Sequence, residues 1–465
     1  MIRRLLLLFA LGAVLSAPAT IRAQTPEQSY RQWARLDFRP QEYAFRRSQM
    51  IRLLRDEGGG LMLVPSSDGT THGDTFRQRE DFWYLTGLEV PGSMLVLDID
   101  RDRSMLFLPA RDYRFENPGR RNDFPGRPLG DDPQLRGTAG TEDILSIDEL
   151  DGYLRSRIAV GAGLQINGGS AGPLTRPEIP MGGSLDETET FLMWVMDRYS
   201  DATIRNAYES VARSRMVKSP QEVRRMTIAA DATAASIAYA AGFVRDGTTE
   251  REIQGHFEYG CRQKGSQSIP FTPIVKSGAN SLWPWRILAA HYDRRDRVME
   301  NGDLVILDVG CEIDGYVSDV GRTFPVNGRF TDIQREKLLL STSVADAIIA
   351  AARPGVTLRD LTAVAYDAIP DHEKPYMQTP SFFGHHIGLQ SGDPALLDEP
   401  LKAGMVFTVE PWYYNHDIEV SVFVEDVILI TEDGAEVLTA GLARTPEALE
   451  QLMVISGATS MERGR

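Results

Sequence analysis

The sequence predicts a two-domain chain of the α+β class, in which a smaller α/β domain precedes a larger α+β domain. Its 465 residues exceed the length of one typical domain. The first part alternates helix-like and strand-like segments, whereas the second part groups helices around apolar strands that pair as hairpins. We expect the first domain to span residues 24–200 and the second to span residues 201–465.

Residues 1–23 predict a secretory signal peptide. Arg3 and Arg4 supply the basic start, residues 5–17 form an apolar run, and Ala23 is an acceptable cleavage position. The apolar run is too short for a transmembrane helix, and no later stretch of the sequence is long enough. We therefore expect a periplasmic or secreted protein with no membrane contact after the signal is removed.

The composition, with 42% hydrophobic and 25% charged residues, is that of an ordinary globular protein. The formal net charge of −15 argues against nucleic acid as a partner and against an anionic membrane. Cys261 and Cys311 are the only cysteines, which excludes a disulfide scaffold and allows at most one bridge. Because one falls in a predicted helix and the other in a predicted strand, we favour two unpaired, buried thiols.

The first domain contains both helical and extended patterns. Apolar spacing predicts helices over residues 41–56, 141–158 and 191–199, and apolar runs predict strands over residues 61–64, 93–99 and 104–108. Residues 111–140 are rich in Arg, Gly, Pro and Asp and are predicted as a long loop.

Capping sequences predict where the helices of the second domain begin. Ser219 with Glu222, Thr249 with Glu252, and Thr331 with Gln334 are capping boxes, and a fourth helix is predicted over residues 357–369. Two apolar strands are predicted over residues 405–410 and 420–430.

Residues 305–320 predict the hairpin around which the second domain is organised. Asp314-Gly315 is the dipeptide best suited to a two-residue type I′ turn. The resulting register places Gly310 opposite Asp319 and makes Asp308 and Asp319 diagonal neighbours, with Cβ atoms roughly 7–8 Å apart. Such carboxylates can share two cations about 3.5–4 Å apart. The alternative is a solvated hairpin face that carries two acids.

Three more polar residues stand in unusual surroundings. Glu425 interrupts an apolar strand, where an unpaired carboxylate costs several kcal/mol and therefore needs an arginine, a proton or a metal. Glu410 ends the other apolar strand, and His385 lies between two glycines in Gly384-His385-His386-Ile387-Gly388. Taken singly, each has an ordinary explanation, as a solvated strand-end Glu or a hydrogen-bonded core His.

Taken together, these residues resemble the five-ligand signature of the metallopeptidases that include methionine aminopeptidase, prolidase and aminopeptidase P. The residues that match the signature are Asp308, Asp319, His385, Glu410 and Glu425. In addition, residues 76–87 resemble a motif in the N-terminal domain of Xaa-Pro aminopeptidases, and residues 216–222 resemble their domain junction. The aromatic residues of the first motif suit a structural role in a core.

The resemblance implies a creatinase-like first domain and a pita-bread second domain that binds two divalent metal ions. Mn²⁺ is the expected ion, with Zn²⁺ and Co²⁺ as alternatives. The resemblance also implies that Glu410 passes the proton of the attacking water to the leaving nitrogen, and that His291 steadies the substrate. The other interpretation of His291 is a surface histidine beside Asp293 and Arg294.

The expected function is that of an Xaa-Pro aminopeptidase, which releases the residue before a proline from a peptide substrate, and the expected assembly is a homo-oligomer. Alternatives are an Xaa-Pro dipeptidase or other small-amide hydrolase, and a metal-binding pseudoenzyme. Gly392 stands where the family usually has a second active-site histidine, and Phe423 stands where arginine is common. Gly119-Arg120-Arg121 lacks the preceding tryptophan, and the insertion Trp283-Pro284-Trp285-Arg286 is either a replacement for lost substrate contacts or a packed loop.

Overall fold

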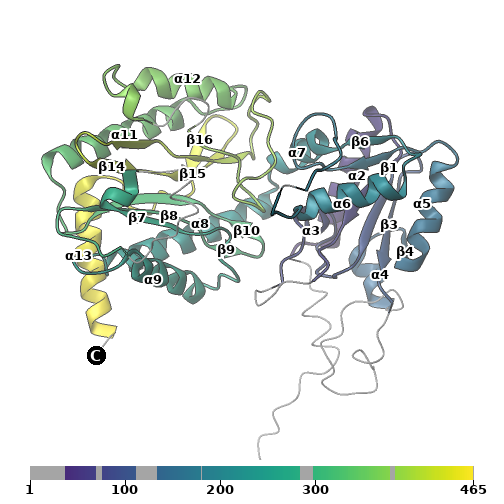
Figure 1. The fold of residues 1–465 in the computed structure, drawn as a ribbon, viewed down its shortest axis with the longest axis horizontal. Coiled ribbons are helices and arrows are strands. Elements are labelled where there is room, and N and C mark those ends of the chain that lie inside the picture. The colour runs from purple at the N-terminus through teal and green to yellow at the C-terminus, as the bar shows by residue number, and fades with distance from the viewer. Residues whose placement is uncertain are drawn as a thin grey trace, which may run out of the picture.

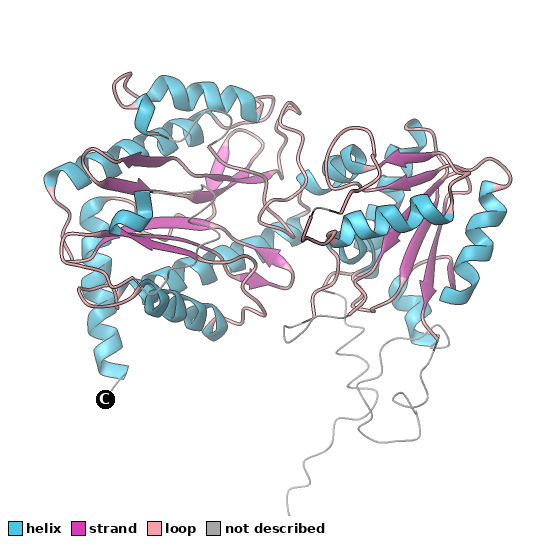
Figure 2. Cartoon of the chain, in the orientation of Figure 1, coloured by secondary structure: helices cyan, strands magenta, loops and turns pink. Residues whose placement is uncertain are grey.

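The computed structural model describes residues 37–69, 76–110, 133–179, 181–282, 297–377 and 383–463. They form two domains that lie side by side (Figure 1). Both domains mix helices with strands (Figure 2). Among the described helices, none is both long and apolar enough to cross a membrane. The expected signal peptide, His291, residues 119–121 and residues 283–286 lie outside the described ranges.

The first domain is built on a six-stranded mixed sheet with the order β4-β3-β2-β1-β5-β6. The three strands β1, β2 and β3 pair antiparallel, and the outer strands pair parallel to their neighbours. The strands are β1 Leu61–Pro65, β2 Met94–Asp98, β3 Arg103–Leu108, β4 Asp143–Ser146, β5 Leu164–Ile166 and β6 Ile204–Asn206. The helices are α2 Pro40–Asp56, α3 Glu80–Thr86, α4 Pro133–Ala139, α5 Leu150–Ile158 and α6 Glu187–Arg198.

Both faces of this sheet are covered, which explains why its central strands are continuous apolar runs. Met62 and Val64 of β1 lie in the core that includes α2. Leu61 and Leu63 point the other way, into a separate core formed with α5 and α6. The alternation of a strand thus supplies two cores from one apolar segment.

Three details of this domain differ from the prediction. Helix α4 lies within the predicted loop over residues 111–140, of which residues 111–132 are outside the described ranges. The start of the predicted helix over residues 141–158 is instead strand β4, because this segment pairs in parallel with β3. Strand β6 lies beyond residue 200 and pairs with β5, so the sheet takes in residues that we had assigned to the second domain.

The helices of the second domain begin at the predicted capping boxes. Ser219, Thr249 and Thr331 each accept a hydrogen bond from the backbone N–H three residues on, and the side chain there bonds back. Figure 1 shows α11 and α12 on one side of the strands and α8 and α9 on the other. The helices are α8 Pro220–Ala241, α9 Glu250–Gln263, α11 Asp332–Ala351, α12 Leu358–Ala368 and α13 Pro446–Arg463. Helix α7 Tyr208–Met216, which precedes them, packs against α2 of the first domain.

The strands of the second domain form small antiparallel sheets, ordered β11-β8-β7, β12-β15-β16 and β13-β14, with a short hairpin β9-β10. The strands are β7 Ile274–Ser277, β8 Leu304–Val309, β9 Glu312–Ile313, β10 Tyr316–Val317, β11 Val320–Pro325, β12 Val406–Val409, β13 Trp412–Asn415, β14 Val420–Phe423, β15 Asp426–Ile430 and β16 Ala435–Val437. Residues 420–430 are therefore two strands rather than the single strand predicted. Strand β14 pairs with β13 and β15 pairs with β12, so Val424 and Glu425 carry the chain from one sheet to another.

The preference for two unpaired cysteines is wrong, because Cys261 and Cys311 form a disulfide with their Cα atoms 5.5 Å apart. Cys261 lies in α9, and Cys311 lies in the link between β8 and β9. The hairpin packs against helix α8, where Thr233 accepts a hydrogen bond from the Cys311 N–H at 2.9 Å, and the disulfide joins it to α9. The sequence pattern does not show this packing of distant segments.

Candidate metal centre

The predicted hairpin forms with the predicted register. Ile313 pairs with Tyr316 at its tip, and Asp308 of β8 pairs with Gly321 of β11. Asp314 and Gly315 both have positive φ, 50° and 81°, as a type I′ turn requires. This register makes Asp308 and Asp319 diagonal neighbours, as expected.

Gly310 is needed between the two acids because the chains approach closely there. A Cβ atom at this position would lie 1.9 Å from the carbonyl oxygen of Ser318. The carboxyl groups of Asp308 and Asp319 are within hydrogen-bonding distance of each other, and both side chains are buried. The hairpin thus places two acids next to each other in a largely buried site.

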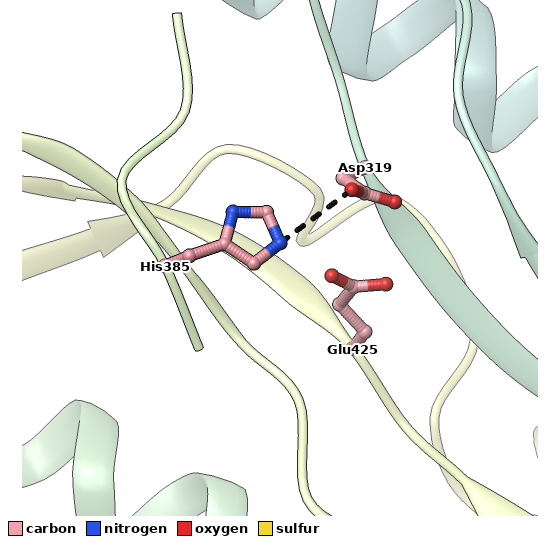
Figure 3. A group of neighbouring side chains, drawn as sticks. All are labelled: Asp319, His385 and Glu425. Atoms are coloured by element: carbon pink, nitrogen blue, oxygen red, sulfur yellow. Dashed lines mark ion pairs between the residues drawn. The ribbon is translucent and has the colours of Figure 1, made fainter. Parts of the chain in front are cut away.

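The other three predicted ligands converge on this pair from separate segments. The His385 imidazole Nε2 lies 3.4 Å from a carboxylate oxygen of Glu410 and 3.7 Å from one of Asp319. Ligand atoms of Asp319, His385 and Glu425 all lie within 4.8 Å of one another. Figure 3 shows these three side chains pointing toward a common centre. The structure therefore brings the five predicted ligands together, while His291 lies outside the described residues.

The four buried carboxyl groups of the cluster have raised pKa values, and a bound cation would stabilise their charged forms. Burial, followed by the neighbouring Glu410 carboxylate, raises the pKa of Asp308 to about 7, and burial raises the pKa of Glu410 to about 7. Burial and the surrounding acids raise the pKa values of Asp319 and Glu425 well above the usual range. One oxygen of Asp319 and one of Glu425 are buried without a hydrogen-bond partner in the described part of the chain. Carboxylate oxygens in this state, with one imidazole, fit divalent metal ions.

Hydrogen bonds of the His385 backbone and of its ring nitrogen Nδ1 orient the imidazole. The N–H of His385 donates to the Thr408 hydroxyl at 3.0 Å, and the Thr408 N–H donates to the His385 carbonyl at 2.8 Å. Nδ1 lies 3.2 Å from the carbonyl oxygen of His386, so in the neutral ring Nδ1 carries the proton and Nε2 presents its lone pair to the cluster. Gly384 permits the approach, because a Cβ atom there would lie 1.8 Å from the Thr408 carbonyl oxygen.

Two supporting residues were not predicted from the sequence. The Thr408 hydroxyl donates to a carboxylate oxygen of Glu410 at 3.2 Å. Arg322, which is fully buried, donates to the carbonyl oxygen of Glu425 and forms an ion pair with Asp426 at 2.7 Å. A polar residue in a buried apolar strand was the available signal for both, since such a group needs a partner.

The first-domain motif reaches the second domain, which its predicted structural role did not include. Arg77 donates to a carboxylate oxygen of Glu312 at 2.6 Å, and Asp81 accepts from Arg215 at 2.8 Å. Arg215 also donates to Asp393 at 2.5 Å. Asp393 belongs to the loop after His385, so the first domain contacts the segment that carries this predicted ligand.

The structure shows what surrounds Phe423 and Gly392, the two positions where the resemblance leads us to expect arginine and histidine. Phe423 packs against Trp412 in a tilted arrangement with ring centroids 4.4 Å apart, and together with Ile306 they form a small apolar cluster. Gly392 faces open space, since no atom of another residue lies within 4 Å of the position its Cβ would take. Phe423 therefore makes an apolar contact where an arginine is common, and no side chain occupies the space beside Gly392.

Comparison with known proteins agrees with the fold and the site. Residues 224–432 match Metallopeptidase family M24, and residues 43–164 match the Aminopeptidase P N-terminal domain. The chain is 28% identical over 449 residues to the Xaa-Pro aminopeptidase of Escherichia coli strain K12, covering 89% of this chain and 98% of that protein. It is also 28% identical over 446 residues to the mitochondrial Intermediate cleaving peptidase 55 of Arabidopsis thaliana, covering 89% and 83%.

A solved structure of Escherichia coli aminopeptidase P in complex with substrate superposes with a TM-score of 0.71 at 26% identity, covering 90% of this chain and 99% of that chain. The two predicted parts of the fold, a creatinase-like α/β domain and a pita-bread catalytic domain, are confirmed. The first domain is thus an aminopeptidase P N-terminal domain, the second is a metallopeptidase domain of the M24 type, and the protein is a metallo-aminopeptidase.

Proposed function

We propose that this metallo-aminopeptidase is an Xaa-Pro aminopeptidase, which releases the residue before a proline. The observation that carries the proposal is the buried cluster of four acids and one imidazole, in which two carboxylate oxygens have no partner among the described residues. The likeness to Xaa-Pro aminopeptidases along nearly the whole of the matched chains supports the specificity for proline.

Two divalent ions held by Asp308, Asp319, His385, Glu410 and Glu425 complete the proposed site, and Mn²⁺ is the proposed ion. Zn²⁺ and Co²⁺ are alternatives, because oxygen ligands with one imidazole suit all three. When bound, such ions acidify a water molecule and polarise the scissile carbonyl. Glu410 would take the proton of the attacking water and deliver it to the leaving nitrogen, and His291 would steady the substrate.

We also propose that the protein is exported to the periplasm or beyond. The basic and apolar start of the chain supports this, and so does the Cys261–Cys311 disulfide, because disulfides persist in oxidising compartments. Sequencing the amino terminus of the mature protein tests the proposal, and an intact Met1 in the exported protein would contradict it. The homo-oligomer stays a prediction that light scattering can check.

Two rival functions have specific support. A dipeptidase is favoured by 32% identity over 229 residues to the Xaa-Pro dipeptidase of Pyrococcus furiosus, which covers 48% of this chain and 63% of that protein. A pseudoenzyme is favoured by Gly392 and Phe423, which lack the usual polar side chains. Metal analysis together with assays on Xaa-Pro dipeptides and longer Xaa-Pro peptides distinguishes them. Turnover of longer peptides supports the aminopeptidase, and a metal-loaded protein that hydrolyses no peptide or amide supports the pseudoenzyme.

A further inference from the structure

A cavity of about 580 Å³ lies between the two domains. The first domain supplies one wall, from strand β1, the start of α3 and the start of α6, and the second domain supplies the loop that follows His385. Its volume lies within the range of about 300–1,000 Å³ that is typical of ligand sites. A second inter-domain cavity of about 490 Å³ shares Arg77, Gln78 and Glu80 with the first.

The loop that follows His385 connects the cavity to the candidate metal centre. Gly392 lines the cavity, and the backbone of the preceding residue, Ser391, interacts with the imidazole of His385. Gly392 adds no side chain to the cavity, and the position its Cβ would take faces open space. A peptide chain held at the metals can therefore continue into the space between the domains.

Most charges on the cavity wall are satisfied by neighbours. Arg215 is paired with Asp81 at 2.8 Å and with Asp393 at 2.5 Å, and Lys218 also donates to Asp393 at 3.0 Å. These groups are buried or nearly buried, and their ion pairs connect the first domain to the loop that follows His385. They leave little charge for a ligand.

Glu80, the first residue of α3, is compensated less well. Its ion pair with Arg77 Nε is long, at 3.5 Å, and the same guanidinium makes a closer contact of 2.6 Å with Glu312. The Glu80 side chain is 25% exposed and lines both cavities. Burial raises its pKa even though Arg215 and Arg77 oppose the shift. A carboxylate in this position can accept a further cation.

We propose that the inter-domain cavity binds the part of a peptide substrate that follows the scissile bond, and that Glu80 pairs with a basic side chain in that part. The inference rests on the proposed peptidase function and deepens it, because it predicts that the preferred substrates are extended peptides with a lysine or arginine downstream of the proline. Glu80 is then a residue that determines specificity, supplied by the domain that lacks the metal ligands.

The test uses hexapeptides that begin Ala-Pro and carry a single lysine at each following position in turn, matched with peptides in which norleucine replaces the lysine. Norleucine keeps the length of the side chain and removes its charge. We expect kcat/KM of the metal-loaded protein to be about tenfold higher for lysine at one position, as for a charged hydrogen bond in a partly buried site. Glu80→Gln should reduce that ratio to about one. The matched control Glu432→Gln removes a carboxylate from an exposed turn outside the cavity and should keep the ratio.

The same peptides are titrated calorimetrically into chelator-treated protein, so that binding is measured without turnover. Turnover with no lysine preference at any position, or an unchanged ratio in a folded and metal-loaded Glu80→Gln protein, overturns the inference and leaves the proposed function in place. Lysine-selective binding that depends on Glu80, without hydrolysis of any peptide, supports the inference and refutes the proposed function. If the protein shows no lysine preference in binding and no turnover of any peptide, both the inference and the proposed function are refuted.

Discussion

Glu425 and Gly321 pair their backbones in both directions, with the Glu425 N–H donating to the Gly321 carbonyl at 2.9 Å and the Gly321 N–H donating back at 3.3 Å. Gly321 lies opposite Asp308 in the neighbouring strand pair. One glycine on β11 thus has a predicted ligand on either side, and it fixes the distance between the hairpin and the segment where the chain changes sheets.

The first prediction concerns this glycine. A Cβ atom at position 321 would lie 2.2 Å from the ring of Phe423 and 2.9 Å from the Cβ of Glu425. We expect Gly321→Ala to lower the free energy of unfolding by about 1–3 kcal/mol, as overpacking does, and to weaken metal binding by moving Glu425. Urea unfolding and metal titration measure both effects. The double variant Gly321→Ala/Phe423→Ala should recover part of the lost metal affinity, and no recovery would show that the ring contact is not the cause.

Glu425→Ala and His385→Ala should each lose metal and activity together. Both side chains face the common centre, so each substitution leaves fewer ligands to hold the two ions. We expect fewer than two metal equivalents and a fall in kcat of at least about 100-fold. Glu436→Ala and His372→Ala are matched controls at exposed positions. A purified Glu425→Ala or His385→Ala protein with two metal equivalents and full turnover would refute the site.

Removing the metal should make stability depend on pH. In the chain without metal, Asp308 and Glu410 have pKa values of about 7, above their ordinary values of 3.8 and 4.5. A raised carboxyl pKa in the folded state stabilises the fold fully below the ordinary pKa, and that stability is lost as the pH rises toward and past 7. We therefore expect the chelator-treated protein to have a higher free energy of unfolding at pH 5 than at pH 8.

Metal binding removes this dependence, because the ions take the place of the protons. The check is urea unfolding from pH 5 to pH 8 with and without Mn²⁺, using the difference between the two series so that other titrating groups cancel. Asp308→Asn removes one of the carboxyls whose pKa is raised and should make the metal-free series less dependent on pH. Identical pH profiles with and without metal would contradict the prediction.

Replacing both cysteines with serine should lower the free energy of unfolding by about 4 kcal/mol. The disulfide joins residues separated by 50 positions, and the loss of a cross-link of that span restores about this much chain entropy to the unfolded state. Urea unfolding of the Cys261→Ser/Cys311→Ser protein measures it, with dithiothreitol-treated wild type as a comparison. A change below about 1 kcal/mol in both would show that the cross-link does not stabilise this fold.

Gly392→His should raise turnover on Xaa-Pro peptides without changing the metal content. Gly392 does not have a positive φ, and the space beyond its Cβ position is open, so the backbone accepts a side chain. A hydrogen-bond donor to the developing charge is typically worth roughly 10²–10³ in rate. Gly392→Ala is the control, since it adds a Cβ atom without an imidazole. A folded, metal-loaded Gly392→His protein no faster than Gly392→Ala would show that another group already supplies this contact.

The sequence by itself determined those parts of the structure that depend on neighbouring residues. The turn at Asp314-Gly315 fixes the hairpin register, because a two-residue loop with positive φ leaves one way to pair the strands. Capping boxes fix where helices begin for the same local reason. The five predicted ligands were found because each is a polar residue in an apolar or glycine-rich stretch, and their order along the chain resembles a known signature.

Only the tertiary structure decided what depends on segments distant along the chain. The Cys261–Cys311 bridge, the change of sheets at Glu425 and the contact of Arg77 with Glu312 join residues whose spacing carries no periodic signal. The open space at Gly392 and the incomplete compensation of Glu80 likewise depend on which side chains the other domain brings near. Hydrophobic burial is non-directional, so a pattern of apolar residues shows that segments pack without showing which partner each one meets.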